Sequence, residues 1–172
     1  MKYSQSYIRL KKELTSRILA LDGAMGTQIQ ALKLEENDYR YGSKIPYKLL
    51  EESSQDLKGN HDLLSLTQPD AIADIHKAYL KAGADILTTN TFNANTISQS
   101  DYGTEALVYE INLHAAKIAK QVAGKNAFVF GDMGPTNRTA SMSPDVENPG
   151  FRNVSFDQLR DSYREQAEGL MD

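Results

Sequence analysis

The chain has 172 residues, of which 24% are charged and 40% hydrophobic, and its formal net charge is −4. This length allows one domain with a hydrophobic core, and the negative charge disfavours nucleic acid and anionic membranes as partners. The sequence contains no cysteine, which excludes disulfides and thiolate ligands and suits a cytoplasmic protein. No apolar run reaches the length of a membrane span, and residues 1–17 lack the apolar region of a signal peptide.

The N-terminal third of the chain predicts a helix, a strand and a second short helix. Apolar side chains recur at helical spacing over residues 3–17, and this face is expected to cover the outside or bottom of the core. These side chains are Tyr3, Tyr7, Leu10 and Leu14. The apolar run that follows predicts a buried strand over 18–22, which stops abruptly at Asp22-Gly23. A short helix is expected over 26–34.

Residues 35–60 are polar and show no period, so we expect a long surface loop, either functional or simply solvated. A helix is expected next, with Thr67 as its N-cap, Asp70 in its first turn and Gly83 at its end. Residues 84–92 are rich in β-formers and end in polar side chains, which predicts the second strand.

The last third predicts two long helices with a strand between them. One helix spans roughly 104–122, because apolar residues line one of its faces. The strand over 127–132 is apolar like one covered on both sides. An irregular stretch over 139–154 leads to the last helix, for which Ser155 and Gln158 form a capping box.

Strands that alternate with helices imply a parallel α/β sheet with right-handed crossovers. Each expected strand ends in a polar cluster, and the carboxyl ends of parallel strands meet on one face, where ligands bind. The candidate site residues in these clusters are Asp22, Gly23, Asn90, Thr91, Phe92, Gly134, Pro135 and Thr136.

These clusters suit a small zwitterionic ligand such as an amino acid. Asp22 can accept an ammonium group, and the backbone of Gly23 can approach a carboxylate closely because glycine has no Cβ. The alternatives remain structural: Asp22 as a turn residue, Asn90 and Thr91 as loop caps, and Gly134-Pro135 as a turn.

Other common sites find no support in the sequence. The three histidines, His61, His76 and His114, lack the spacing of a zinc site. There is no nucleophile elbow and no dinucleotide-binding fingerprint. We therefore expect neither a catalytic nor a metal-binding residue in this chain.

Three segments closely resemble the homocysteine S-methyltransferase family. They are LDGAMGTQIQ (21–30), DLKGNHDLLSLTQPDAIADIHKAYLKAGADILTTNTFNA (56–94) and GPTNRTASMSPDVENPGFRNVSFDQL (134–159). The third segment resembles the cobalamin-dependent branch in particular, the methionine synthases. His61 departs from the family pattern, in which a second asparagine is expected.

The resemblance implies a (βα)8 TIM barrel, of which three βα units and an N-terminal helix are expected here. Residues 1–172 would then be an incomplete, N-terminal part of the homocysteine-binding barrel domain. The family's Asp-Gly, TNTF and GPT motifs fall on the eight candidate residues given above.

The resemblance also implies a reaction for the full-length enzyme, in which a methyl group passes from methyltetrahydrofolate through cobalamin to homocysteine. A zinc ion held by three cysteines would activate the thiol. Because this chain has no cysteine, we expect it to bind no cofactor and to be inactive alone. The expected partners are homocysteine, the remaining barrel, the folate and cobalamin modules, and further copies of the chain itself.

Two alternatives remain open at this point. One is a stand-alone homocysteine methyltransferase that uses another methyl donor. The other is a non-catalytic α/β interaction domain that has kept the shape of the family.

Overall fold

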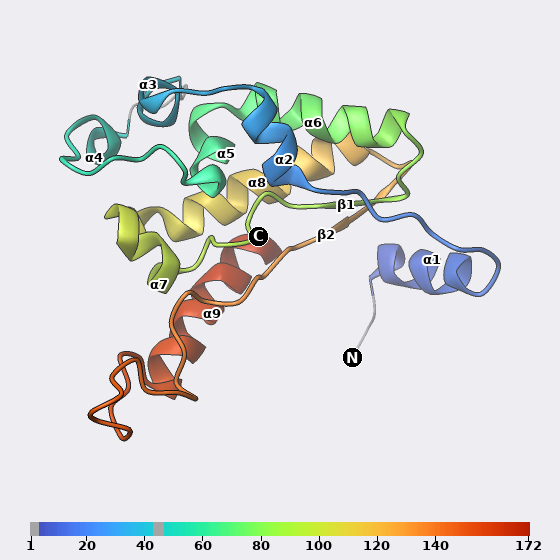
Figure 1. Ribbon diagram of the computed structural model, residues 1–172. Helices are drawn as coiled ribbons and strands as arrows, with labels where there is room; N and C mark the ends of the chain where they lie inside the picture. The colour runs from blue at the N-terminus through green and yellow to red at the C-terminus, as the bar shows by residue number, and fades with distance from the viewer. Residues whose placement is uncertain (1–3, 43–46) are drawn as a thin grey trace.

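The computed structural model describes residues 4–42 and 47–172 (Figure 1). The helices are α1 (Gln5–Leu14), α2 (Met25–Ala31), α3 (Glu36–Arg40), α4 (Lys48–Glu51), α5 (Leu64–Thr67), α6 (Pro69–Lys81), α7 (Thr96–Gln99), α8 (Val108–Ala123) and α9 (Phe156–Met171). The strands are β1 (Ile86–Thr88) and β2 (Phe128–Phe130), and the 3-10 turns are η1 (His61–Leu63), η2 (Ser100–Tyr102) and η3 (Glu105–Leu107).

The sheet is parallel, as the sequence predicts, but smaller. β1 pairs with β2 in the register Ile86 to Phe128. The expected strand over 18–22 is reduced to a single parallel bridge between Leu21 and Ile86. It ends there because the carboxylate of Asp22, rather than another backbone carbonyl, accepts the N–H of Thr88. The described residues therefore form a mixed α/β structure with two strands, and a closed barrel is not seen.

The two faces of this sheet have different partners. On one face, Leu87 packs with Tyr79 and Leu80 of α6 and with Ala123 of α8. The opposite face carries Phe128, whose ring lies 4.1 Å below the guanidinium carbon of Arg9 in α1. Figure 1 shows α1 apart from the α6 and α8 layer. The larger hydrophobic core lies among the helices and includes the fully buried residues Leu50, Leu57, Leu63, Leu64, Ile72 and Ile111.

The N-terminal helix is correctly predicted to exist, but its role is different. None of its residues is buried, and Ile8 is 51% exposed and Leu14 57% exposed. Tyr3 lies outside the described residues. Arg9 instead donates to the carbonyls of Lys125 and Ala127, so a charged side chain, not an apolar face, joins α1 to the sheet.

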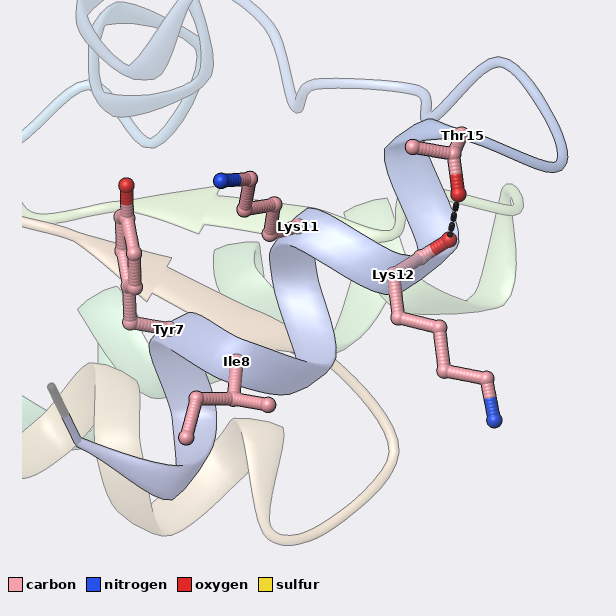
Figure 2. A pocket seen from close by; sticks show the side chains of 5 residues that line it. All are labelled: Tyr7, Ile8, Lys11, Lys12 and Thr15. Carbon is pink, nitrogen blue, oxygen red and sulfur yellow. Dashed lines mark hydrogen bonds between the residues drawn. The ribbon is translucent and has the colours of Figure 1, made fainter.

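The outer surface of α1 carries an open hollow of about 320 Å³ (Figure 2). Tyr7 and Lys11, one helical turn apart, extend to the same side of the helix, and the hydroxyl of Thr15 donates to the carbonyl of Lys12. Arg9 does not line this hollow and instead contacts the carbonyl of Ala127, the residue before β2.

The polar stretch 35–60 is more ordered than an irregular loop, because it contains α3 and α4. Residues 43–46 of this stretch lie outside the described residues. Arg40 donates to the carbonyls of Leu50, Ser53 and Gln55, and Glu36 accepts the N–H of Leu57. Side chains bonded to distant backbone thus order a segment that has no periodic pattern.

Of two predicted helix starts, one is confirmed and one is wrong. The capping box of Ser155 and Gln158 is confirmed at the start of α9. The N-cap predicted at Thr67 is wrong, because Thr67 ends the separate helix α5 and α6 begins with Pro69 at its first position. No helix in the described ranges is long and apolar enough to cross a bilayer.

Candidate functional site

A cavity of about 330 Å³ opens at the carboxyl end of β1 and β2. The loop after the first bridged segment, the turn η1 and the loop after β1 contribute most of its wall. The lining residues are Gly23, Ala24, Met25, Gly26, His61, Asp62, Thr88, Thr89, Asn90, Thr91, Phe92, Asn93 and Asp132. Four of the eight predicted site residues, Gly23, Asn90, Thr91 and Phe92, lie in this wall.

Asp22 lies at the edge of the cavity without lining it. Its Oδ2 accepts the backbone N–H of Thr88 and its Oδ1 accepts the hydroxyl of Thr88, each at 2.9 Å. Its structural role is therefore to tie the end of the first segment to β1. The predicted contact between Asp22 and an ammonium group stays a prediction.

Gly23 approaches the ring of Tyr79 from α6. A Cβ at position 23 would lie 3.2 Å from Cε1 and from the hydroxyl oxygen of that ring. This spacing is tight, so the absence of a side chain lets the backbone pass between Tyr79 and the cavity.

Asn90 and Thr91 are both buried and both hold loops together. The side-chain amide of Asn90 donates to the carbonyl of His61, which joins the end of β1 to η1. The hydroxyl of Thr91 lies 2.6 Å from that of Thr89 and donates to the carbonyl of Asp132. These contacts match the structural alternative of loop capping, while both residues still line the cavity.

The GPT loop lies beside the cavity rather than in its wall. The N–H of Gly134 donates to the carbonyl of Phe92, and a Cβ at position 134 would lie 2.5 Å from that oxygen. Thr136 is bonded outward, since its N–H donates to the hydroxyl of Tyr163 and its own hydroxyl donates to the carbonyl of Arg138. Pro135 is exposed.

The structure adds two carboxylates that the site prediction lacks. Asp62 is buried, and Oδ1 accepts the N–H of Asn93. Burial raises the pKa of Asp62 from 3.8 to about 7, and the charge of Asp132 adds to this effect. Burial, followed by the charge of Asp22, also raises the pKa of Asp132. Asp132 ends the third predicted strand just as Asp22 ends the first, so a sequence signal for it existed.

His61 is the departure from the family pattern, and it lines the cavity. Its Nδ1 lies 3.1 Å from the hydroxyl of Tyr39, and burial lowers the pKa of His61. The ring is therefore neutral near pH 7. It contributes a hydrogen-bonding surface to the wall rather than a positive charge.

The residues of this chain do not fit a zinc site built from three thiolates. The sequence has no cysteine. Within residues 4–42 and 47–172, no group of three or more histidine, aspartate and glutamate side chains is arranged to hold a metal ion.

The model of the homocysteine S-methyltransferase family matches residues 19–172. The chain belongs to the homocysteine S-methyltransferase family. The match begins after α1, so it covers the cavity, both strands and every predicted site residue of this family member.

Solved structures support the fold. The chain is similar to the homocysteine methyltransferase MmuM from Escherichia coli, with 20% identity and a TM-score of 0.62 for the metallated form. For the oxidized form the identity is 22% and the TM-score 0.59. The alignments cover 95% of this chain and 53% or 52% of the MmuM chain, so this family member spans about half the length of that enzyme.

Proposed function

We propose that residues 1–172 form the N-terminal part of a homocysteine S-methyltransferase barrel and bind the amino-acid end of homocysteine. The observation that carries this proposal is the cavity at the strand ends, whose wall joins Gly23 of the Asp-Gly motif with the TNTF motif. Membership of the family supplies the substrate class.

In this proposal the described residues bind and orient the substrate. The close backbone approach at Gly23 favours the carboxylate of the amino acid, and the carboxylates of the cavity favour its ammonium group. Thr89, Thr91 and Asn90 fix the loops that carry these groups through hydrogen bonds between side chain and backbone.

The methyl donor is proposed from the resemblance of residues 134–159 to the cobalamin-dependent branch. Methyltetrahydrofolate would supply the methyl group through cobalamin, which other modules of a longer enzyme would bind. Methyl transfer to sulfur requires the thiolate of homocysteine, because the protonated thiol is a poor nucleophile. This chain has no cysteine to hold the zinc ion that the family resemblance implies, so thiol activation lies outside its own residues.

Isothermal titration calorimetry of the 172-residue chain with L-homocysteine tests the proposal. Gly26 lines the cavity, and a Cβ there would meet nothing within 4 Å, so Gly26→Leu adds a large side chain at the cavity wall with no clash at its Cβ. We expect saturable binding to the wild-type chain and its loss in Gly26→Leu. The matched control is Gly150→Leu in an exposed loop, which should bind normally. Equal binding by both variants would place the ligand elsewhere.

A second measurement tests the proposal that this chain alone is inactive. We expect the purified chain to contain less than stoichiometric zinc by elemental analysis. We also expect no methionine from homocysteine with either methylcobalamin or betaine as donor. Turnover above background with betaine would instead favour a stand-alone enzyme with another methyl donor.

A further inference from the structure

A glutamine behind the cavity wall binds the two segments that leave the sheet. Gln166 belongs to α9, and its side chain is fully buried without lining the cavity. Its Nε2 donates to the carbonyl of Thr91 at 2.8 Å and to the carbonyl of Asp132 at a longer 3.4 Å. Thr91 follows β1, Asp132 follows β2, and both line the cavity. One side chain of α9 therefore connects the two segments.

The two acceptors determine how the amide of Gln166 is oriented. Both are carbonyl oxygens, to which only the NH2 group of the amide can donate, so the amide oxygen must point the other way. That oxygen, Oε1, is buried and finds no hydrogen-bond partner among the described residues. A buried acceptor without a partner lowers stability. Glutamine is thus a costly choice for filling this position, which indicates that the two hydrogen bonds serve more than the packing of α9.

α9 holds Gln166 at a fixed depth in the protein. Ser162 and Gly169 lie one turn before and one turn after it on the same side of the helix, and all three are buried. The hydroxyl of Ser162 accepts the N–H of Ile97 in α7. Gly169 lies so close to α8 that a Cβ there would be 2.7 Å from the carbonyl oxygen of Tyr109. Contacts on both sides therefore fix the amide before any ligand binds.

The hydrogen bonds of Gln166 complete a closed network behind the cavity. The hydroxyl of Thr91 donates to the carbonyl of Asp132 at 2.7 Å, and Gln166 donates to this carbonyl and to that of Thr91. Each segment is thus bonded both to the other segment and to α9. Such a network limits how far the two segments can move relative to each other.

We propose that Gln166 is a positioning residue of the cavity: it acts through Thr91 and Asp132, and it keeps the segments after β1 and β2 in the relative position that shapes the binding wall. The inference rests on the proposed function for the ligand, the amino-acid end of homocysteine. It extends the site to α9, a helix that contributes no side chain to the wall.

Hydrogen exchange measured by NMR tests the proposal without a ligand. Gln166→Met keeps the length of the side chain, removes the donor and removes the unpaired oxygen, so the stability of the whole chain should change little. We expect the N–H groups of Asp132 and Gly134 to exchange about 10-fold faster, the effect of losing about one hydrogen bond. The N–H of Ala115 in the middle of α8 should exchange at the wild-type rate. An equal rise at all three groups would show a general loss of stability and overturn the proposal.

Calorimetry with L-homocysteine measures the effect on the cavity. We expect the affinity of Gln166→Met to be about 10-fold below that of the wild-type chain, for the same lost hydrogen bond. The matched control is Gln121→Met, which replaces an exposed glutamine of α8 and should change neither the affinity nor the exchange rates.

Gln166→Glu supplies a rescue that depends on pH. Burial raises the pKa of a carboxyl group, and near pH 5 the protonated group can donate to the same carbonyls. The affinity of this variant should therefore match that of the wild-type chain near pH 5 and fall below it near pH 9. Both proteins are measured at each pH, because Asp62, Asp132 and His61 of the cavity titrate in both. This variant also decides the question if Gln166→Met does not fold.

The measurements separate this inference from the proposed function. If the wild-type chain binds no homocysteine, the proposed function fails, and the exchange rates of Asp132 and Gly134 decide the inference alone. If homocysteine binds equally well to Gln166→Met and to the wild-type chain, the inference is wrong and the function stands. Weak binding by Gln166→Glu near pH 5 would also contradict the inference, because the restored donor should restore the position of the two segments.

Discussion

The carboxylate of Asp22 accepts both the backbone N–H and the hydroxyl of Thr88, each at 2.9 Å. The backbone N–H of Asp22 still donates to the carbonyl of Ile86, as expected for parallel pairing. The next hydrogen bond, from the N–H of Thr88, goes to the side chain of Asp22 instead of to a backbone carbonyl. The side chain therefore ends the strand pairing just before the cavity. This explains why the segment before Gly23 is a bridge rather than a strand.

Removal of this carboxylate should destabilise the fold. Asp22→Ala leaves the N–H and hydroxyl of Thr88 without their acceptor, and we expect a loss of about 1–3 kcal/mol in the free energy of unfolding. Asp22→Asn keeps one acceptor oxygen and should lose less. Urea unfolding followed by circular dichroism measures both. A loss in Asp22→Ala no larger than that of Asp74→Ala, on an exposed helix surface, would contradict the structural role.

Gly134→Ala should be destabilising for a steric reason. The new Cβ would lie 2.5 Å from the carbonyl oxygen of Phe92 and 2.8 Å from its ring, so the two loops beside the cavity must separate. We expect a cost of about 1–3 kcal/mol, as for other overpacked sites. Gly150→Ala is the control, because its nearest contact would be 3.8 Å away. Equal melting temperatures of the two variants would show that the two loops can move apart without a cost in stability.

The stability of the chain should carry a pH signature of Asp62. The pKa of Asp62 is raised from 3.8 to about 7, so between these values the folded state binds more protons than the unfolded state. The contribution is therefore favourable at low pH and is lost as the pH rises toward 7, up to about 4 kcal/mol in total.

Asp62→Asn isolates this contribution. We expect the variant to match the wild-type chain near pH 4 and to be more stable than it near pH 8. Burial lowers the pKa of His76, so the contribution of His76 to stability increases with pH, opposite to that of Asp62. His76 is present in both proteins, so its contribution cancels when the stability of the variant is compared with that of the wild type. A difference that does not change with pH would show that Asp62 titrates normally in the folded chain.

The 172-residue chain, produced alone, should self-associate. Leu21 is 56% exposed and Phe130 39% exposed. They belong to the two outer segments of the sheet, which flank β1. Unpaired strand edges and exposed apolar side chains favour association. Sedimentation velocity at micromolar concentration should show a dimer or larger species.

The double variant Leu21→Ser with Phe130→Ser should shift this equilibrium toward monomer. Val146→Ser is the control, because Val146 is exposed but lies in the loop before α9. A wild-type chain that sediments as a single monomeric species would refute the expectation.

The elements predicted correctly from the sequence are those that depend on local patterns. The apolar face of α8 follows from Ile111 and Ala115, which are both buried. The capping box at Ser155 is likewise a local signal. α3 and α4 were not predictable in this way, because Arg40 and Glu36 order that region through backbone groups more than nine residues away.

Among the residues of the candidate site, those marked by a local sequence pattern could also be predicted, and those that depend on distant contacts could not. Asp22 and Asn90 are visible in the sequence because polar residues at the ends of apolar strands are distinctive. Asp62 is not, because its burial depends on the segment around Asn93, which lies 31 residues away. Its role as a titrating group exists only after the chain has folded.

The attachment of α1 has a consequence for the order of assembly. A helix of ten residues is too short to be stable alone in water, and α1 buries no side chain that could compensate. Arg9 finds its two carbonyl acceptors and the ring of Phe128 only when β2 and the turn before it are in place. α1 is thus expected to become ordered only after β2, so the order of α1 reports on the completion of the sheet.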